Sequence, residues 1–424
     1  MNPRIVAGII AGVVSAGTSM PLGAQASNET ALEQNARAIH DRVITLDTHA
    51  DITVTNFTPE RNYTQDLPTK VNLPKMTRGQ MDAVFFVVYV GQGPLTEEGY
   101  AQAYREASAK FDAIHWLTGE MAGSQIELAL RAQDVPRIVA RGKKAALIGV
   151  ENAYSLGTDL GRIAEFHTRG MRYMSLAHNG HSQFSDSNTG ERQGWMHNGL
   201  SEAGRAAIAE MNRLGVMVDV SHPSRQSMMQ TIAISKAPII ASHSAVRALA
   251  NHSRNMDDEQ LRALKNNGGV IQIVAFSAYV KAIRPDSPRS LALEALRNEF
   301  GLPPSGTGST AAALAALPSD ARAQYDSRLA EIDKRLPADP RATVKDFVDH
   351  IDYAVKLIGI DHVGIASDFD GGGGIDGWND ASEAFNVTFE LVRRGYTEAE
   401  IGKLWSGNLL RVMAEVERIA SAAR

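Results

Sequence analysis

Short apolar runs rich in β-branched residues recur eight times along this 424-residue chain, and helical stretches lie between them. Most of the runs are continuously apolar, which is typical of strands buried on both faces. Eight such strands alternating with helices predict an α/β fold, a TIM (β/α)8 barrel. A doubly wound open sheet is the main alternative, but no G-x-G-x-x-G sequence follows the first run to support it. The runs are residues 43–48, 83–90, 145–150, 171–177, 216–221, 238–242, 269–276 and 362–367.

Two segments interrupt this alternation. Residues 1–26 contain a basic Arg4, an apolar core and the small-residue pattern Ala24-Gln25-Ala26, so they predict a cleaved signal peptide, with an uncleaved N-terminal anchor as the alternative. Residues 27–424 would then form a single barrel domain, exported to the periplasm or secreted. Residues 278–341 predict a helical insertion between strands seven and eight, either a lid or a lengthened barrel helix with an irregular elbow.

The net charge limits the partners that we expect, and the absence of cysteine limits the kind of metal site. A formal net charge of −5 gives no reason to expect nucleic acid or an anionic membrane as a partner. The stretch 397–419 is amphipathic and predicts packing on the barrel, so we expect no membrane anchor in the mature chain. Because the chain contains no cysteine, any metal site must use His, Asp and Glu, which favours zinc or another divalent ion.

Seven ionisable side chains stand at the ends of six predicted strands. In a TIM barrel, these ends face the active site. A single buried histidine is usually a core residue, but removing this many imidazoles and carboxylates from water is unfavourable unless a cation or mutual pairing compensates. Residues i and i+2 of a strand share one side, so His49 and Asp51 point to one place, as a divalent metal requires. The seven are His49, Asp51, Glu151, His178, His222, His243 and Asp368.

The segments around these residues resemble the membrane (renal) dipeptidase family of zinc metallopeptidases, and the chain looks like a bacterial exported member. The resemblance runs from about residue 38 to the C-terminus and covers residues 278–341 least. The matching segments, in order, are His49-Ala50-Asp51, Glu151, Leu176-Ala177-His178-Asn179, Asp219-Val220-Ser221-His222-Pro223-Ser224, Ser242-His243-Ser244, Ser253-Arg254-Asn255, Ser367-Asp368-Phe369-Asp370-Gly371 and Gly407-Asn408-Leu409-Leu410-Arg411.

This resemblance implies two zinc ions per chain, bridged by Glu151. One ion would be held by His49, Asp51 and Glu151. The other would be held by Glu151, His222 and His243.

The resemblance also implies roles around the substrate. His178 would contact the scissile carbonyl region, and Arg254 would bind the C-terminal carboxylate, for which its planar fork is suited. A surface salt bridge with Asp257 or Asp258 is the alternative for Arg254. Asp368 would handle the proton. The family cleaves dipeptides, tolerates a D-residue at the C-terminal position and, in some members, opens β-lactam rings.

The resemblance therefore implies a zinc dipeptidase. A metal-bridging hydroxide would attack the peptide bond, since metal coordination can bring the pKa of water to about 7. Another amidohydrolase-type hydrolase on the same barrel is the alternative, acting on a lactone, N-acyl amino acid, β-lactam or phosphotriester. A non-catalytic exported binding protein is a third hypothesis. Mammalian members of the family use cysteines and a lipid anchor, and because this chain has neither, a homodimer stays open.

Overall fold

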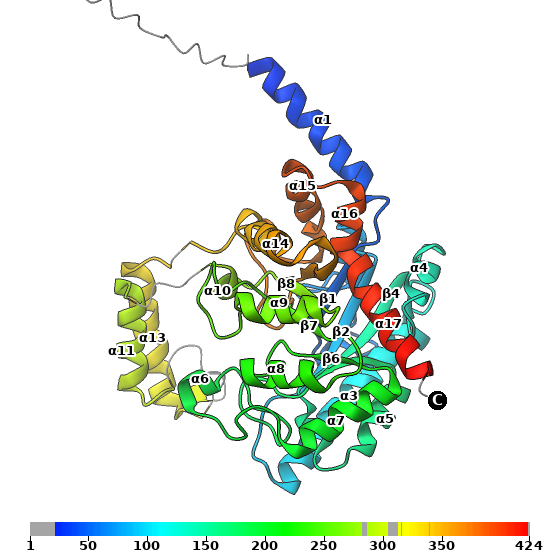
Figure 1. Ribbon diagram of the computed structural model, residues 1–424. Helices are drawn as coiled ribbons and strands as arrows, with labels where there is room; N and C mark the ends of the chain where they lie inside the picture. Colours follow the sequence, from blue (N-terminus) through cyan, green and yellow to red (C-terminus); the bar gives the residue numbers. More distant parts are fainter. Residues whose placement is uncertain (1–21, 282–285, 304–312, 315, 339, 423–424) are drawn as a thin grey trace, which may run out of the picture.

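Eight parallel strands form the wall of a barrel, and helices lie between them on the outside (Figure 1). The computed structural model describes residues 22–422 except 282–285, 304–312, 315 and 339. The barrel strands are β1 (Leu46–Asp51), β2 (Ala83–Tyr89), β4 (Lys144–Glu151), β5 (Met171–Ser175), β6 (Met217–Asp219), β7 (Ile240–Ser244), β8 (Val270–Val274) and β9 (Val363–Ala366).

The strands follow one another around the barrel in chain order, from β1 to β9. β1 and β9 meet at the seam, where Asp368 N donates to His49 O (3.0 Å) and Asp51 N donates to Phe369 O (2.8 Å). A doubly wound sheet would instead reverse its strand order at a switch point. The TIM-barrel prediction is therefore confirmed.

All eight predicted runs become strands, with shifts at their ends. The first strand begins and ends three residues later than the predicted 43–48, so His49 and Asp51 lie inside it. The shift arises because Val43 N still bonds to Ile39 O, in the turn that ends the preceding helix. A further short strand, β3 (Ile126–Leu128), pairs with β4 and was not predicted, since three residues carry too little periodicity.

Several helices begin directly after a residue whose side chain caps them. The Ser201 side chain accepts a hydrogen bond from Gly204 N, and Asp257 forms a capping box with Gln260. The helices are α1 (Leu22–His40), α2 (Leu73–Arg78), α3 (Glu97–Trp116), α4 (Asp134–Val139), α5 (Gly161–Thr168), α6 (Gly190–Gln193), α7 (Glu202–Leu214), α8 (Arg225–Ile234), α9 (Asp258–Asn266), α10 (Ser277–Val280), α11 (Pro288–Glu299), α13 (Ser319–Arg335), α14 (Val344–Ile358), α15 (Phe385–Arg393), α16 (Glu398–Gly402) and α17 (Asn408–Ala422).

The insertion after β8, the seventh barrel strand, is helical, as predicted. Helices α11 and α13 pack on each other around Leu296, Leu302 and Tyr325 and stand to one side of the barrel (Figure 1). This small cluster is separate from the main core. No described residue of α11 or α13 lines the cavity at the barrel mouth, whereas Tyr279, near the start of the insertion, does line it.

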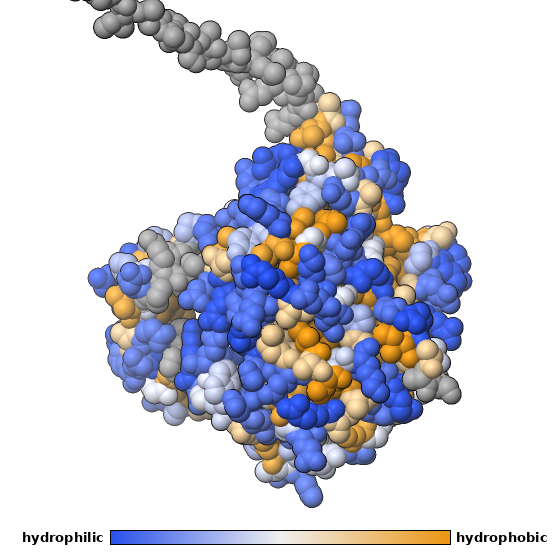
Figure 2. All heavy atoms as spheres, viewed as in Figure 1, coloured by the Kyte–Doolittle hydropathy of each residue, from blue (hydrophilic) through white to orange (hydrophobic). Residues whose placement is uncertain are grey.

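The two ends of the chain differ. Of the predicted signal peptide, residues 1–21 lie outside the described part, and residues 24–26 lie in α1, which packs on α15. The signal peptide and the domain boundary after it thus stay predictions. At the other end, α17 packs on the barrel through Val412 and Val416, as the amphipathic pattern predicts. Among the described residues, no helix is both long and apolar enough to cross a membrane. The face in Figure 2 is mostly hydrophilic with small apolar patches.

Candidate metal centre and substrate pocket

The side chains singled out at the strand ends converge on one cavity at the mouth of the barrel. The cavity has a volume of about 440 Å³. His49 is completely buried beside it and contacts its lining carboxylates. The other predicted site residues line it directly: Asp51, Glu151, His178, His222, His243, Arg254 and Asp368.

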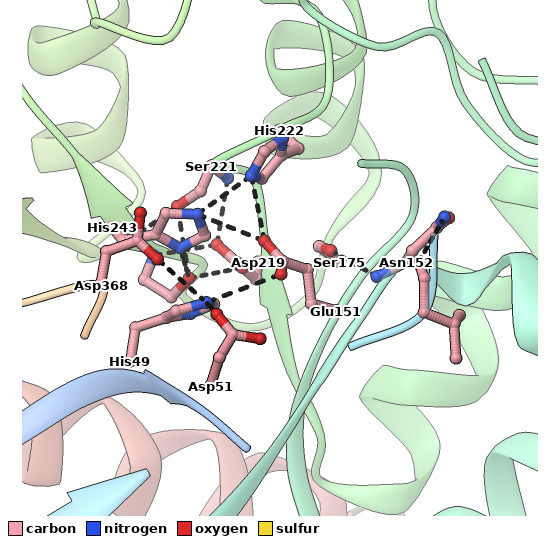
Figure 3. A network of polar contacts seen from close by, with 12 residues as sticks. His49, Asp51, Glu151, Asn152, Ser175, Asp219, Ser221, His222, His243 and Asp368 are labelled. Carbon is pink, nitrogen blue, oxygen red and sulfur yellow. Dashed lines mark hydrogen bonds and ion pairs between the residues drawn. The ribbon is translucent and has the colours of Figure 1, made fainter. Parts of the chain in front are cut away.

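Glu151, the last residue of β4, directs its two carboxylate oxygens toward two different groups of side chains (Figure 3). Oε1 lies 3.0 Å from Nε2 of His222 and 3.3 Å from Nε2 of His243. Those two nitrogens are 3.0 Å apart. Oε2 instead lies 3.6 Å from Nε2 of His49. One carboxylate therefore joins two clusters of donor atoms.

The second cluster is built on β1 and the segment after β9. Nε2 of His49 lies 3.8 Å from Oδ2 of Asp51 and 4.0 Å from Oδ1 of Asp368. Asp368 has a left-handed backbone with φ +57°, a conformation that non-glycine residues rarely adopt. Strained backbone of this kind gathers at functional sites, where the surrounding structure holds it in place.

These atoms fit a divalent metal. His49 Nε2, Asp51 Oδ1 and Glu151 Oε1 are buried, and none of them has a hydrogen-bond partner among the described residues. A buried polar atom without a partner is destabilising, and a shared cation bound by these atoms would remove that penalty. The donor set of imidazole nitrogens and carboxylate oxygens suits zinc or a similar ion.

The candidate ligand atoms can be grouped around a metal ion in more than one way. His178 and Asp368, which the resemblance places at the substrate, also offer atoms close enough to other candidate ligands to share an ion with them. Among the described residues, three sets have ligand atoms within 4.8 Å of one another: His49, Glu151 and His243; Glu151, His178 and His222; and His49, Asp51 and Asp368.

Two buried aspartates that sequence reasoning missed hold the ligands from behind. Oδ1 of Asp219 accepts from the backbone N–H of Ser221 (3.0 Å) and of Ser242 (2.9 Å). Its Oδ2 accepts from the Ser242 hydroxyl (2.6 Å), which lies 2.8 Å from Nδ1 of His243. Because the Ser242 hydroxyl donates its hydrogen bond to Asp219, its oxygen is available to accept a hydrogen bond from Nδ1–H of His243. This tautomer leaves Nε2 of His243 free to bind a metal.

Asp47 repeats this arrangement at the barrel seam. Its Oδ1 accepts from the backbone N–H of His49 (3.3 Å) and of Ser367 (2.9 Å), and its Oδ2 accepts from the Ser367 hydroxyl. The Tyr173 hydroxyl donates to Thr48 O (3.1 Å) and lies 3.0 Å from Nδ1 of His49. An acidic residue inside an apolar run, as in Leu46-Asp47-Thr48, is the sequence signal that could have revealed this role.

Burial and mutual charge set the protonation of the cluster. Burial lowers the pKa of His222 and His243 well below the usual value, so both imidazoles are neutral and can bind a metal. Burial also lowers the pKa of His178 to about 4. Burial opposes a charge on His49 too, but Glu151, Asp51 and Asp368 outweigh it and raise its pKa to about 9.

The carboxyl group of Asp368 has a raised pKa. Burial is the main cause that raises its pKa, and the nearby negative charges of Asp51 and Glu151 add to it, against the positive charge of His49. The resulting pKa is about 8, so the group exchanges its proton near neutral pH.

Arg254 is 3% exposed and lines the cavity. Nη1 donates to Ser221 O, and Nη2 donates to His243 O at 3.1 Å. The alternative of a surface salt bridge is wrong, because Asp257 pairs with Arg225 and Asp258 with Arg262. The cavity is also lined by residues to which the sequence analysis gave no role: Tyr89, Lys110, Phe276, Tyr279 and Asp370.

Comparisons with known proteins agree with this geometry. The family model for membrane dipeptidase, peptidase family M19, matches residues 33–424. The dipeptidase tcpJ of Claviceps purpurea is 32% identical over 366 residues, which cover 85% of this chain and 72% of tcpJ. The dipeptidase aclJ of Aspergillus oryzae is 29% identical over 392 residues, 89% of this chain and 79% of its own.

Solved structures show the same relationship. The probable dipeptidase PvdM from Pseudomonas aeruginosa is 34% identical with a TM-score of 0.82, over 92% of this chain and 99% of PvdM. A metallo peptidase from Rhodobacter sphaeroides, liganded with a phosphinate mimic of the dipeptide L-Ala-D-Ala, shares the fold at 22% identity and a TM-score of 0.67, over 88% of this chain and 99% of its own. Because the family match spans nearly the whole chain, this protein belongs to the membrane dipeptidase family, peptidase family M19, and is a metal-dependent dipeptidase.

Proposed function

We propose that this protein is a binuclear zinc dipeptidase in which Glu151 joins the two ions. The observation that carries the proposal is the division of the Glu151 oxygens, with Oε1 facing His222 and His243 and Oε2 facing His49. A carboxylate that binds a single ion would not need donor atoms on both sides. The proposed ligands are His49, Asp51 and Glu151 for one ion, and Glu151, His222 and His243 for the other.

The chain supplies the remaining groups that peptide hydrolysis needs. When bound, two divalent ions sharing a carboxylate would bring the pKa of a bridging water to about 7, making hydroxide available for attack, and would polarise the scissile carbonyl. Asp368 can take a proton from the attacking water and pass it to the leaving amine, because its pKa of about 8 allows both steps near neutral pH. His178 can donate an N–H to the oxygen that becomes negative.

The pocket suits a small zwitterionic substrate. Its volume of about 440 Å³ lies in the ordinary range for small-molecule sites. Arg254 would bind the C-terminal carboxylate of the dipeptide. We extend the proposal to dipeptides with a D-residue at the C-terminal position, and the L-Ala-D-Ala mimic bound by the Rhodobacter sphaeroides protein motivates that extension.

Metal analysis combined with a dipeptide panel tests this function. The purified protein is loaded with zinc, and the zinc content per chain is measured. L–L and L–D dipeptides are then compared with the C-terminal amides of the same dipeptides. We expect about two ions per chain and cleavage of free dipeptides in preference to their amides, because Arg254 requires a carboxylate. A zinc-loaded protein that leaves the panel uncut but opens lactones, N-acyl amino acids or β-lactams would replace the proposal with the alternative hydrolase.

We also propose that the protein is exported to the periplasm or secreted, with residues 1–26 removed. The support is the basic Arg4, the apolar core after it and the small residues at positions 24–26. The N-terminal sequence of the protein recovered from its native cells, after fractionation, checks this. We expect the mature chain to start at Ser27, and a cytoplasmic protein that retains its first residues would contradict the proposal.

A further inference from the structure

Lys110 is a cation that lines the substrate cavity although it lies on a helix outside the barrel. It lies in the fourth turn of α3, and its side chain lines the cavity together with Asp51 and Tyr89. Its Nζ lies 5.2 Å from the centroid of the Tyr89 ring, within range of a cation–π contact. This contact favours an ammonium position beside the pocket.

Apart from the Tyr89 ring, the ammonium group has no hydrogen-bond or ion-pair partner in the part of the chain that the structure describes. Glu106, one turn earlier on α3, is the usual ion-pair partner for a lysine at this spacing. The Glu106 carboxylate instead accepts from Nε2 of Gln102 (2.7 Å). Among the described residues, Lys110 forms neither a hydrogen bond nor an ion pair, and burial lowers its pKa against the opposing effect of Asp51 and Glu151. An ammonium group drawn from water without a partner is destabilised, so the site favours an anion beside it.

Lys110 and Arg254 lie on opposite walls of the cavity. Arg254 is tied to carbonyl oxygens of Ser221 and His243, after β6 and within β7, whereas Lys110 lies over Tyr89 at the end of β2. Strands β2 and β7 are four places apart around the eight-stranded wall, which is the greatest separation the barrel allows. Glu151 on β4 and the groups it joins lie between these walls.

We propose that Lys110 selects dipeptides whose N-terminal residue carries an acidic side chain. This inference rests on the proposed dipeptidase function. A dipeptide with its carboxylate at Arg254 and its peptide bond at the Glu151 centre directs its N-terminal residue toward the β2 wall. The α-ammonium group of that residue finds carboxylates in the same cavity, on Asp368 and Asp370. A side-chain carboxylate of Asp or Glu is then the group whose charge complements Lys110.

A structural role for Lys110 makes a different prediction. If the ammonium group only neutralised Asp51 and Glu151, its loss would weaken metal binding and lower the turnover of every dipeptide by the same factor. Selection of an acidic side chain instead changes the ratio between two substrates. L-Glu-L-Ala and L-Gln-L-Ala have nearly the same shape and differ in that charge, so their kcat/KM ratio separates the two roles.

The experiment uses the full-length zinc-loaded protein and the variants Lys110→Met, Lys110→Arg and Arg105→Met. Arg105 lies on the same helix, is exposed and bonds to Gln102, so its variant controls for removing a positive charge from α3. We expect the wild type to prefer L-Glu-L-Ala, and we expect Lys110→Met to lower the ratio by about tenfold or more, the usual effect of losing a charged hydrogen bond. Lys110→Arg should keep most of the preference, Arg105→Met should keep all of it, and zinc content should stay unchanged.

Two failures are distinguishable. If the wild type cleaves both dipeptides with equal kcat/KM, or if Lys110→Met lowers both by one factor together with the zinc content, the inference on Lys110 is overturned and the dipeptidase function stands. If the zinc-loaded wild type cleaves no dipeptide at all, the proposed function is wrong, and the inference is wrong with it.

Discussion

Asp219 on β6 receives two hydrogen bonds from Ser242 on β7, one from the backbone N–H at 2.9 Å and one from the hydroxyl at 2.6 Å. Ser242 directly precedes the proposed ligand His243. Asp47 on β1 and Ser367, the residue that follows β9, form the same pair directly before Asp368. Each pair forms hydrogen bonds between neighbouring strands, at the position directly before a functional side chain. The barrel therefore uses buried carboxylates to fix the orientation of its functional side chains.

Replacing Asp219 by Asn should weaken metal binding more than it weakens the fold. The amide keeps the shape, but its NH2 group cannot accept the Ser242 hydroxyl proton, so the imidazole of His243 loses its fixed orientation. Loss of such an outer partner typically lowers metal affinity by about 10- to 100-fold. Competition with a chelator measures the affinity. Asp112→Asn, at an exposed aspartate, is the control, and equal zinc affinity in both variants would contradict the role of Asp219.

Replacing Asp51 by Ala should empty one of the two proposed metal positions. The ion assigned to His49, Asp51 and Glu151 would keep two protein ligands, whereas the other would keep all three. We expect the zinc content to fall from about two ions to about one per chain, with dipeptide hydrolysis lost, since a two-ion site needs both for attack and polarisation. Metal analysis together with the circular dichroism spectrum checks this. A content that stays at two would show that Asp51 is not a ligand.

Replacing Asp368 by Asn should slow turnover while the protein keeps its metal. Asn retains the size and tolerates the left-handed backbone at φ +57°, but it cannot carry a proton. Positioned proton transfer typically contributes about 10²- to 10⁴-fold to the rate, so kcat should fall within that range. Steady-state kinetics and zinc content are measured on one preparation. A variant with normal kcat would place the proton on another group, and a variant without zinc would make Asp368 a ligand.

His350 on α14 should make the fold sensitive to acid. Its Nδ1 accepts from Val246 N (3.0 Å), and its Nε2–H donates to Val280 O (2.8 Å), an arrangement that requires the neutral ring. Burial lowers the pKa of His350, although the hydrogen bond to Val280 opposes the shift. The unfolded chain therefore binds more protons below pH of about 6.5, and the stability contributed by the neutral ring is present above that pH and lost as the pH falls.

The test compares the wild type with His350→Gln in urea unfolding at several pH values. We expect the free energy of unfolding to fall less steeply in the variant between pH 7 and pH 5, because one proton-linked group is gone. At pH 8 the wild-type ring is neutral in both the folded and the unfolded chain. The difference in unfolding free energy between the two proteins at that pH is therefore the reference. Identical slopes in the two proteins would show that His350 does not contribute to the acid sensitivity.

The sequence by itself determined the fold class, the order of the elements and the residues that meet at the barrel mouth. Continuous apolar runs predict buried parallel strands because both faces of such a strand must avoid water. A barrel brings the C-terminal ends of its strands to one mouth, so His49, Glu151, His222 and His243 could be placed together from their positions at strand ends alone.

Only the tertiary structure decided how these groups face one another. The pairs of Asp47 with Ser367 and Asp219 with Ser242, the division of the Glu151 oxygens and the reach of Lys110 into the cavity depend on strand register, barrel closure and helix packing. Register, closure and packing bring together residues that are far apart in the chain. Asp47 and Ser367, for example, are 320 positions apart. Local periodicity carries no information on such distances, because it reports which side of an element is buried and not which neighbour buries it.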